Sequence, residues 1–329
     1  MSKSRIYGLP VLAIDLGGTK TITAIVSANG QILVEERCLT QANEGQSSVV
    51  NRLLSAVDHM LSLKSISPSQ LDSISIAAAG CIDIERGLIT SSPNFPFPSW
   101  SNVPLRDIVR DKYKVATFLL NDASAAVLGE HRFGSGKGAN NLILLTVGTG
   151  IGGGIIINGK LYSGLFGGAG EIGHMTIDIG GTRCVCGNIG CLEILASGTA
   201  MAREAKRRLS LGESSSLFQM VRGRIDAITA EEIGIAAKGG DALALDIIGK
   251  AATYLGVGMV NMVNIFNPEM IIVGGGVAKL GDLLLDPARR VVNERAFSAS
   301  ARAVRILLAQ LGDKAGVIGA AVCTLLQSE

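Results

Sequence analysis

Three cysteines and one histidine lie close together near the middle of the chain, and this cluster constrains the fold more than any other feature. The segment reads Glu171-Ile-Gly-His174 and then Cys184-Val-Cys186-Gly-Asn-Ile-Gly-Cys191-Leu-Glu193. Three thiolates and one imidazole complete a tetrahedral zinc shell, and closed shells of this kind are structural. Small buried cysteines and a core histidine are the alternative, although their coincidence at ligand spacing is improbable. We therefore predict a zinc-stiffened loop over residues 171–193, with the ligands His174, Cys184, Cys186 and Cys191.

Two glutamates bracket the predicted zinc ligands. A metal without an open coordination position does no chemistry, so its role is to fix the loop. His174 keeps a second ring nitrogen, and Glu171 and Glu193 stand beside the ligands. The loop is therefore expected to hold three polar groups towards a hydroxylated molecule.

Composition and charge exclude several classes of protein. The 329 residues suffice for two domains or lobes, and with 18% charged and 47% hydrophobic residues the chain is compact and globular. A net charge of +2 gives no electrostatic reason to expect nucleic acid or an anionic membrane as a partner. The other cysteines, at positions 38, 81 and 323, stand singly, which suits reduced thiols in a cytoplasm.

We expect neither a leader nor a membrane span. Asp15 interrupts the apolar run that follows Lys3 and Arg5, which does not fit a signal peptide. Residues 138–159 carry no charge but contain a glycine cluster that breaks them into two strands. Residues 251–268 are also uncharged, but their asparagines and Pro268 favour a buried helix.

Strand and turn signals recur along the chain. A strand at 11–14 precedes Asp15-Leu-Gly17-Gly18-Thr19-Lys20, and strands at 21–26 and 32–36 flank the hairpin signal Asn29-Gly30. The same order returns with strands at 142–147 and 153–157 around Gly148-Thr149-Gly150, followed by Asn158-Gly159. This weak repeat predicts two similar α/β lobes that face each other. Further expected elements are helices at 49–61, 123–133, 199–209, 229–238, 241–266 and 314–327, and strands at 74–78, 115–120 and 270–273.

Three glycine-rich turns each follow a predicted strand. Glycines let backbone N–H groups approach phosphate oxygens closely, and Thr19 adds a hydroxyl donor. Asp15 is suited to hold magnesium through water. One such motif is equally an ordinary tight turn, but three of them are what a nucleotide cleft between two lobes needs. The predicted nucleotide-binding residues are Asp15, Gly17, Gly18, Thr19, Lys20, Gly148, Thr149, Gly150, Gly274, Gly275 and Gly276.

Asp122 lies where the strand at 115–120 gives way to a helix. Open α/β sheets place their ligand crevice at such strand ends. A helix N-terminus favours the ionised carboxylate, which can then take a proton from an attacking hydroxyl during phosphoryl transfer. The alternative is a helix N-cap, and the position of this residue alone favours that alternative.

Four features in order resemble the ROK family of sugar kinases, repressors and uncharacterised open reading frames. They are Asp15-Leu-Gly-Gly-Thr-Lys20, Asn121-Asp122, the glycine run 148–154 leading to Glu171-Ile-Gly-His174, and the cysteine segment 184–193. The match spans essentially the whole chain, and the cysteine segment is its most diagnostic part. The resemblance implies a two-lobed α/β fold of the actin-like ATPase, or ribonuclease H-like, type. The expected smaller lobe is 1–122, completed by 312–329, and the larger lobe is 123–311 with the zinc loop.

The resemblance also implies ATP-dependent phosphorylation of a hexose, with Asp122 as the general base, catalytic Mg²⁺ and structural Zn²⁺. Glucose is the expected acceptor and glucose 6-phosphate the product, because the segment around Asn94 is most similar to that of glucose-phosphorylating members. The implied substrate-binding residues are Gly80, Asn94, Asn121, Asp122, Glu171, His174 and Glu193. A cytoplasmic enzyme of carbohydrate metabolism and glycolysis is expected, as a homodimer or homotetramer.

Other functions stay open within the same family and fold. Kinases for N-acetylmannosamine, N-acetylglucosamine or fructose share most of these residues, and polyphosphate can replace ATP as the donor. A sugar-sensing regulator carries a helix-turn-helix domain before the first glycine motif, and only ten residues precede Val11. A chaperone or filament protein has the same ATPase fold, but no use for a zinc loop flanked by carboxylates. We therefore expect a kinase.

Overall fold

The computed structural model describes residues 8–92 and 100–326, which form two compact units. The first unit comprises Met1–Gly138, Gly154–Gly170 and Gln310–Glu329, and the second comprises Ala139–Gly153 and Glu171–Ala309. The lobe boundaries expected from the sequence stay a prediction. Asn94 lies outside the described residues.

The first unit is built on a five-stranded sheet in the order β3-β2-β1-β4-β7. Strands β1, β2 and β3 form an antiparallel meander, whereas β4 and β7 run parallel to β1. Because β1 and β4 are covered on both faces, their residues are almost all buried and read as apolar runs rather than alternating patterns. The strands are β1 Val11–Leu16, β2 Lys20–Val26, β3 Ile32–Leu39, β4 Ser73–Ala78 and β7 Thr117–Asn121.

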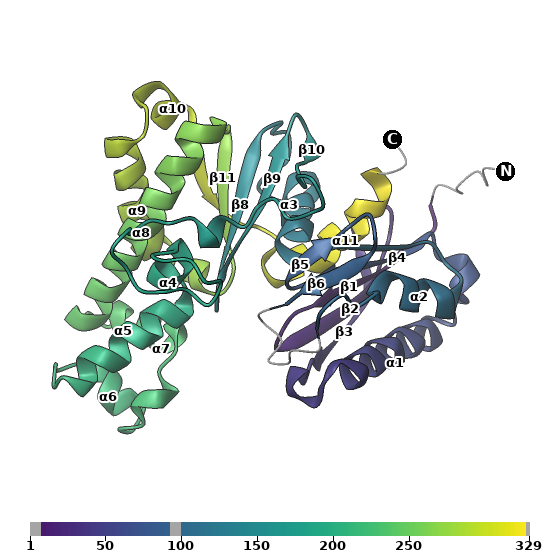
Figure 1. Ribbon diagram of the computed structural model, residues 1–329, viewed down its shortest axis with the longest axis horizontal. Coiled ribbons are helices and arrows are strands. Elements are labelled where there is room, and N and C mark those ends of the chain that lie inside the picture. Colours follow the sequence, from purple (N-terminus) through teal and green to yellow (C-terminus); the bar gives the residue numbers. More distant parts are fainter. Residues whose placement is uncertain (1–7, 93–99, 327–329) are drawn as a thin grey trace. The chain divides into compact units, whose positions relative to one another are not determined.

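Among its described residues, the first unit also contains four α-helices and the small hairpin of β5 and β6. Helix α1 packs on β2 and β3, while α11 packs on α3, β1 and β4 (Figure 1, α11 in yellow). A Cβ atom at Gly319 would lie 1.6 Å from the carbonyl oxygen of Ala125, so the backbones of α3 and α11 touch without intervening side chains. The elements are α1 Gln46–Lys64, α2 Leu105–Tyr113, α3 Asp122–Phe133, α11 Ala315–Leu326, β5 Cys81–Asp83 and β6 Leu88–Ser91.

A buried carboxylate fixes the segment that leads into α11. Glu130, on α3, is fully buried, and its carboxylate accepts hydrogen bonds from the backbone N–H groups of Ser135, Gln310 and Leu311 at 2.8, 3.1 and 2.7 Å. Buried charges persist when they are hydrogen-bonded in this way. The link ties the last segment of the chain to the middle of the first unit.

The second sheet has the order β10-β9-β8-β11-β12. Strand β11 is fully buried and runs parallel to both β8 and β12. The expected hairpin at Asn158-Gly159 forms between β9 and β10, with φ of 52° and 74° at these two residues. The strands are β8 Leu142–Val147, β9 Ile151–Ile157, β10 Lys160–Leu161, β11 Met270–Gly274 and β12 Arg305–Leu308.

Helix α8 is the long apolar helix of the second unit. Among the described residues it is the one helix that is long and apolar enough to cross a membrane, judged by length and composition alone. Of its most apolar 18-residue stretch, 61% is buried inside the protein, and the helix packs on α9, α4 and α7. It is therefore a core helix, as the sequence predicts. The helices are α4 Leu192–Ala196, α5 Gly198–Ser210, α6 Ser216–Met220, α7 Ala230–Lys238, α8 Ala242–Phe266, α9 Asp282–Arg295 and α10 Ser298–Ala303.

Short 3₁₀ helices connect several of these elements. They are η1 Ala42–Glu44, η2 Pro68–Gln70, η3 Ile172–His174, η4 Ile225–Ala227, η5 Val277–Leu280 and η6 Gly312–Lys314. The predicted strand–turn–strand order occurs in both sheets, and each expected helix is present. Several boundaries differ by a few residues; for example, β3 ends at Leu39 and β9 begins at Ile151. Asp15 is the fifth residue of β1 rather than the residue after it, because its backbone continues to pair with Ile22 and Ala77.

Candidate functional site

In the first unit, the predicted polar residues gather at one edge of the sheet. Strands β1, β4 and β7 are parallel and in register, with Leu16 opposite Ala78 and Ala78 opposite Asn121. Their carboxyl ends therefore meet at the same edge. Asp15 lies one residue before the end of β1, and Asp122 directly follows β7. This is the edge at which open α/β sheets bind ligands.

Asp15 carries the most perturbed carboxyl group of this edge. Burial, reinforced by the negative charge of Asp122, raises its pKa to about 7. A Cβ atom at Gly316 would lie 2.4 Å from Oδ2 of Asp15, so only glycine lets the first turn of α11 lie against the carboxylate. A carboxyl group with such a raised pKa is suited to bind a cation, such as hydrated Mg²⁺, because the cation favours the ionised form.

The first glycine turn is held by a residue that sequence analysis missed. The hydroxyl of Thr40 donates to the carbonyl oxygen of Gly17 at 2.7 Å. The backbone N–H of Thr40 donates to the carbonyl oxygen of Thr19 at 2.9 Å. Thr40 is buried and follows β3, so the pairing of β2 with β3 brings it to the turn. Lys20, a predicted phosphate ligand, forms an exposed ion pair with Asp313 at 3.0 Å.

The N-cap of α3 is Asn121, which corrects the interpretation of Asp122 as a cap. The side-chain oxygen of Asn121 accepts from the N–H groups of Ala123 and Ser124 at 2.9 and 3.1 Å. Its Nδ2 donates to the carbonyl oxygen of Gly80 at 3.0 Å. Asp122 is instead the first helical residue. The cap could have been recognised from the sequence, because asparagine is as good an N-cap as aspartate.

In the second unit, the predicted zinc ligands come together. The ligand atoms of His174, Cys184, Cys186 and Cys191 all lie within 4.8 Å of one another. Nδ1 of His174 is 3.7 Å from Sγ of Cys184, and Sγ of Cys186 is 3.7 Å from that of Cys191. Zn–S bonds of about 2.3 Å in a tetrahedron place sulfurs about 3.8 Å apart. The residues therefore fit a structural zinc ion.

The glycines of the loop have the conformations that the sequence suggested. Gly187 and Gly190 have φ of 95° and 62°. A Cβ atom at Gly190 would lie 1.6 Å from the carbonyl oxygen of Asp178, so no other residue fits at this position. The backbone thus turns tightly enough to bring the cysteines to one point.

Glu171, His174 and Glu193 also lie together. Nε2 of His174, the ring nitrogen facing away from the thiols, is 3.9 Å from Oε2 of Glu171. Glu193 accepts a hydrogen bond from the N–H of Ile151 at 2.9 Å, beside the second glycine turn. Burial raises the pKa of Glu171, and the charge of Glu193 adds to this rise while His174 opposes it. The carboxylates are thus close enough for their charges to interact.

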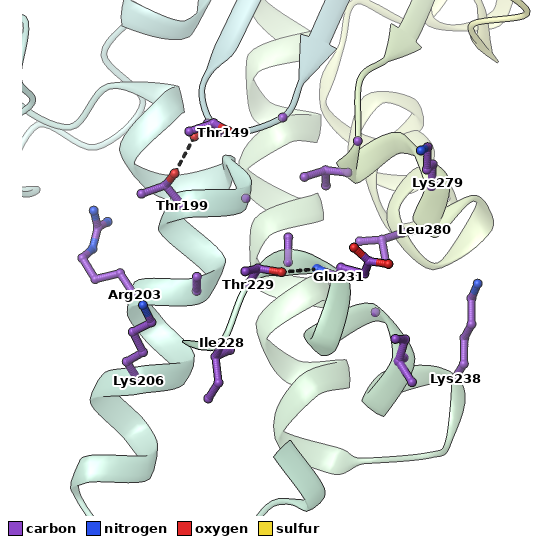
Figure 2. Close-up of a pocket in the computed structure, with 18 residues that line it drawn as sticks. Thr149, Thr199, Arg203, Lys206, Ile228, Thr229, Glu231, Lys238, Lys279 and Leu280 are labelled. Carbon is purple, nitrogen blue, oxygen red and sulfur yellow. Dashed lines mark hydrogen bonds between the residues drawn. The ribbon is translucent and has the colours of Figure 1, made fainter. Parts of the chain in front are cut away.

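A cavity of about 930 Å³ lies entirely within the second unit. Gly148, Thr149 and Gly276 from the predicted turns line it, whereas Gly150, Gly274 and Gly275 do not. Figure 2 shows Arg203 and Lys206 of α5 on one side, and Glu231 and Lys238 of α7 with Lys279 on the other. Its apolar lining includes Ile228, Ile235, Val277 and Leu280. The size and the mixture of apolar and cationic groups suit a nucleotide.

No sequence motif marks the residues that α5 and α7 contribute to this cavity. The hydroxyl of Thr199 donates to the carbonyl oxygen of Thr149 at 2.8 Å, and the N–H of Gly198 donates to that of Gly148 at 2.7 Å. These bonds join the start of α5 to the second glycine turn. The cavity wall is therefore built from distant segments that only the fold brings together.

Comparisons with known proteins agree with this architecture. The model of the ROK family matches residues 11–326. A glucokinase of Halalkalibacterium halodurans is 38% identical, over 94% of this chain and 92% of its own. A xylose repressor of Caldicellulosiruptor bescii is 35% identical, over 94% of this chain and 76% of its own.

A solved structure extends the likeness to three dimensions. It is a ROK family glucokinase from Streptomyces griseus in complex with glucose and AMPPNP, with a TM-score of 0.83 and 36% identity. The match covers 95% of this chain and 98% of that one. The two mixed sheets, the cysteine–histidine cluster and these likenesses together lead to one conclusion: the chain belongs to the ROK family and has its actin-like ATPase fold.

Proposed function

We propose that this protein is an ATP-dependent hexose kinase that converts glucose to glucose 6-phosphate. The observation that carries the proposal is the sheet edge of the first unit, where a buried Asp15 with a raised pKa lies beside Asp122. The relatives named glucokinase, among them the structure with glucose and AMPPNP, support the same reaction.

Asp122 is the proposed general base. The carboxylate accepts the proton of the 6-hydroxyl as the hydroxyl oxygen attacks the γ-phosphorus, and the bond from this phosphorus to the bridging oxygen of ADP breaks. Asn121 supplies the N-cap of α3, and Oδ1 of Asp122 accepts a hydrogen bond from the N–H of Ala123 at 2.8 Å, which fixes the position of the proposed base. Glucose 6-phosphate and ADP are the products.

The donor site is proposed to include the cavity of the second unit. Its apolar lining suits an adenine ring, and its lysine and arginine side chains favour an anionic ligand. The turns at 17–20, 148–150 and 274–276 are proposed to contact the phosphates, and Asp15 to hold Mg²⁺ through water. Bound Mg²⁺ neutralises charge on the transferred phosphoryl group.

Sugar-binding residues are proposed for each unit separately. Glu171, His174 and Glu193 are proposed to form hydrogen bonds with sugar hydroxyls, and a zinc ion held by His174 and the three cysteines would keep their loop rigid. Gly80, Asn94 and Asn121 are the proposed sugar contacts of the first unit. A site built for hydroxyls rejects sugars that lack them. We propose a cytoplasmic homodimer or homotetramer as the working form.

A sugar-sensing regulator is the competing function, and the xylose repressor among the relatives favours it. The experiment that separates the two is a coupled assay of ADP release with ATP and magnesium. The acceptors are glucose, mannose, fructose, N-acetylglucosamine and N-acetylmannosamine, with polyphosphate as a second donor. We expect glucose to give the highest kcat/KM. A tenfold lead of an N-acetyl sugar overturns the glucose assignment, and binding without turnover of any sugar overturns the kinase.

A further inference from the structure

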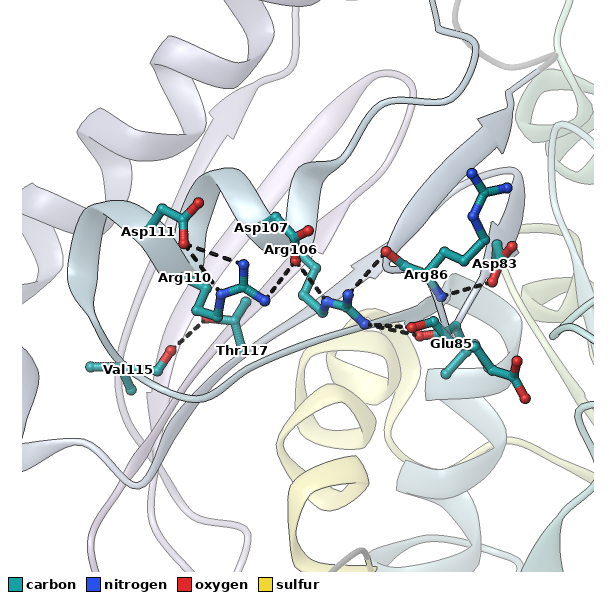
Figure 3. Close-up of polar contacts among 10 residues, drawn as sticks. Asp83, Glu85, Arg86, Arg106, Asp107, Arg110, Asp111, Val115 and Thr117 are labelled. Carbon is teal, nitrogen blue, oxygen red and sulfur yellow. Dashed lines mark hydrogen bonds and ion pairs between the residues drawn. The ribbon is translucent and has the colours of Figure 1, made fainter.

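A tight turn joins β5 to β6 in the first unit, and one arginine side chain donates several hydrogen bonds to its backbone. Within the turn, the N–H of Gly87 donates to the carbonyl oxygen of Asp83 at 2.8 Å, and that of Arg86 donates to Oδ1 of Asp83 at 2.9 Å. The turn therefore curls so that successive carbonyl oxygens face α2. Figure 3 shows Arg106, on the first turn of α2, reaching these oxygens.

The guanidinium of Arg106 binds the backbone of three consecutive residues. Nη1 donates to the carbonyl oxygens of Ile84 and Glu85 at 3.4 and 2.9 Å, and Nη2 donates to that of Arg86 at 3.0 Å. Nε donates to Oδ1 of Asp107 at 3.0 Å, which fixes the plane of the guanidinium. The planar fork of arginine makes these bonds at once, which a lysine ammonium cannot reproduce.

The turn also requires glycine beside this arginine. Gly87 has a φ of 70°, and a Cβ atom there would lie 2.3 Å from Nε of Arg106. Backbone and guanidinium are thus packed in direct contact. The side chain of Arg106 is 23% exposed, and its bonds to the carbonyl oxygens of Glu85 and Arg86 lie at the surface.

The hairpin transmits this restraint to Gly80. A Cβ atom at Gly80 would lie 2.5 Å from the carbonyl oxygen of Ser91, so the open end of the hairpin closes on this glycine. The hydroxyl of Ser92 donates to the carbonyl oxygen of Ala79 at 2.8 Å, which closes it further. The Gly80 carbonyl in turn accepts the hydrogen bond from Asn121, the cap of the helix that begins at Asp122.

We propose that Arg106 is a positioning residue for the sugar acceptor. It holds the β5–β6 hairpin in place, and through the hairpin it sets the backbone of Gly80 against Asn121. This inference rests on the proposed kinase function. Loss of Arg106 shifts the acceptor-binding backbone but leaves the cap bonds from Ala123 and Ser124 to Asn121, so binding of sugar suffers more than the chemical step.

The test is steady-state kinetics of Arg106→Ala, Arg106→Lys and the control Arg110→Ala. Arg110 lies one turn along the same helix and pairs with Asp107 and Asp111, without a bond to the hairpin (Figure 3). We expect Arg106→Ala to raise the KM for glucose about tenfold or more, since small misplacements in a site carry large penalties. The KM for ATP should stay within about twofold, and kcat should fall less than the KM for glucose rises.

Arg106→Lys should lie between the parent and the alanine variant, and Arg110→Ala should match the parent. Calorimetric titration of glucose onto each variant gives the same order from binding alone, and circular dichroism reports the folded fraction. A folded Arg106→Ala or Arg106→Lys protein with an unchanged KM for glucose overturns the proposal, as does an equal rise for Arg110→Ala. A parent without activity on any sugar instead overturns the kinase function.

Discussion

The two groups of proposed substrate-binding residues are held in place by different means. In the first unit, Asp15 and Asp122 stand at the edge of a sheet whose core residues, such as Ile14 and Ile76, are fully buried. In the second unit, the loop that carries the zinc ligands is largely exposed: Ile179 and Val185 are 92% and 84% exposed. Apolar packing therefore fixes the first group, whereas we expect the second group to depend on coordination of the proposed zinc ion. Damage to one support should leave the other intact.

The largest effect is expected on kcat, from a substitution in the first unit that leaves its folding intact. Asp122→Asn keeps the shape of the side chain but loses the proton acceptor. We expect kcat to fall by roughly 10²–10⁴-fold, while the midpoint of thermal unfolding and the affinity for glucose stay near those of the parent. Activity within a few-fold of the parent would reject Asp122 as the base.

The second prediction concerns the free energy that ionisation of Asp15 costs the folded first unit. Its pKa of about 7 lies above that of an unfolded aspartate, so ionisation opposes folding. The stability that this group contributes is complete below about pH 4 and is lost as the pH rises through about 7. Asp15→Asn should therefore raise the free energy of unfolding at pH 8 by on the order of 2–4 kcal/mol, and much less at pH 4.

Urea unfolding at both pH values, without nucleotide or magnesium, measures this difference. Glu171→Gln provides the comparison from the second unit, because the pKa of Glu171 is also raised but its side chain is 47% exposed. For Glu171→Gln, we expect only a small pH-dependent increase in the free energy of unfolding. If Asp15→Asn raised the free energy of unfolding equally at pH 4 and pH 8, the raised pKa of Asp15 would be contradicted.

Removal of a zinc ligand should damage the second region alone. Cys186→Ser is expected to abolish stoichiometric zinc, lower the midpoint of thermal unfolding and raise the KM for glucose about tenfold, because a disordered loop misplaces Glu171 and Glu193. Elemental analysis should find one zinc per parent chain. Cys38→Ser, on β3 of the first unit, is the control and should keep its zinc. A fully active, metal-free parent protein would refute the zinc loop.

The smallest effect is expected at Thr40. Thr40→Val keeps the volume but removes the hydroxyl that bonds Gly17 and Thr21. We expect a loss of about 1–2 kcal/mol in the free energy of unfolding and a few-fold rise in the KM for ATP. Thr253→Val serves as the control, since that hydroxyl bonds a carbonyl within its own helix at the surface. Equal results for the two variants would remove Thr40 from the support of the turn.

The sequence predicted the elements whose signals are local. The two hairpins and the long helices depend on spacing over a few residues, and the structure confirms them. The four predicted zinc ligands also come together, while a zinc ion at this cluster stays a prediction. Helix α2 was missed because its nine residues are rich in charge, and α9 because Pro287 lies within it and weakens the helical pattern.

The supports of the site were also missed, and for a different reason. Arg106 and Thr40 act on backbone carbonyls that are distant in sequence, and backbone groups carry no sequence signal. The wall of the cavity combines α5 with α7, whose lining residues form no motif. The N-cap at Asn121 was not predicted, although both side chains of the pair Asn121-Asp122 are suited to that position. Such features follow from tertiary contacts, so they appear only once the chain is folded.

The place of α11 has a consequence for biosynthesis. This helix comes from the end of the chain, yet it packs on β1 and β4, which are made near the beginning. While the ribosome translates the second unit, the face of the first sheet that α11 later covers is still exposed. Chains in this state are prone to aggregation. The first unit is thus the first to be synthesised and the last to be completed, and premature termination before residue 315 leaves it without its cover.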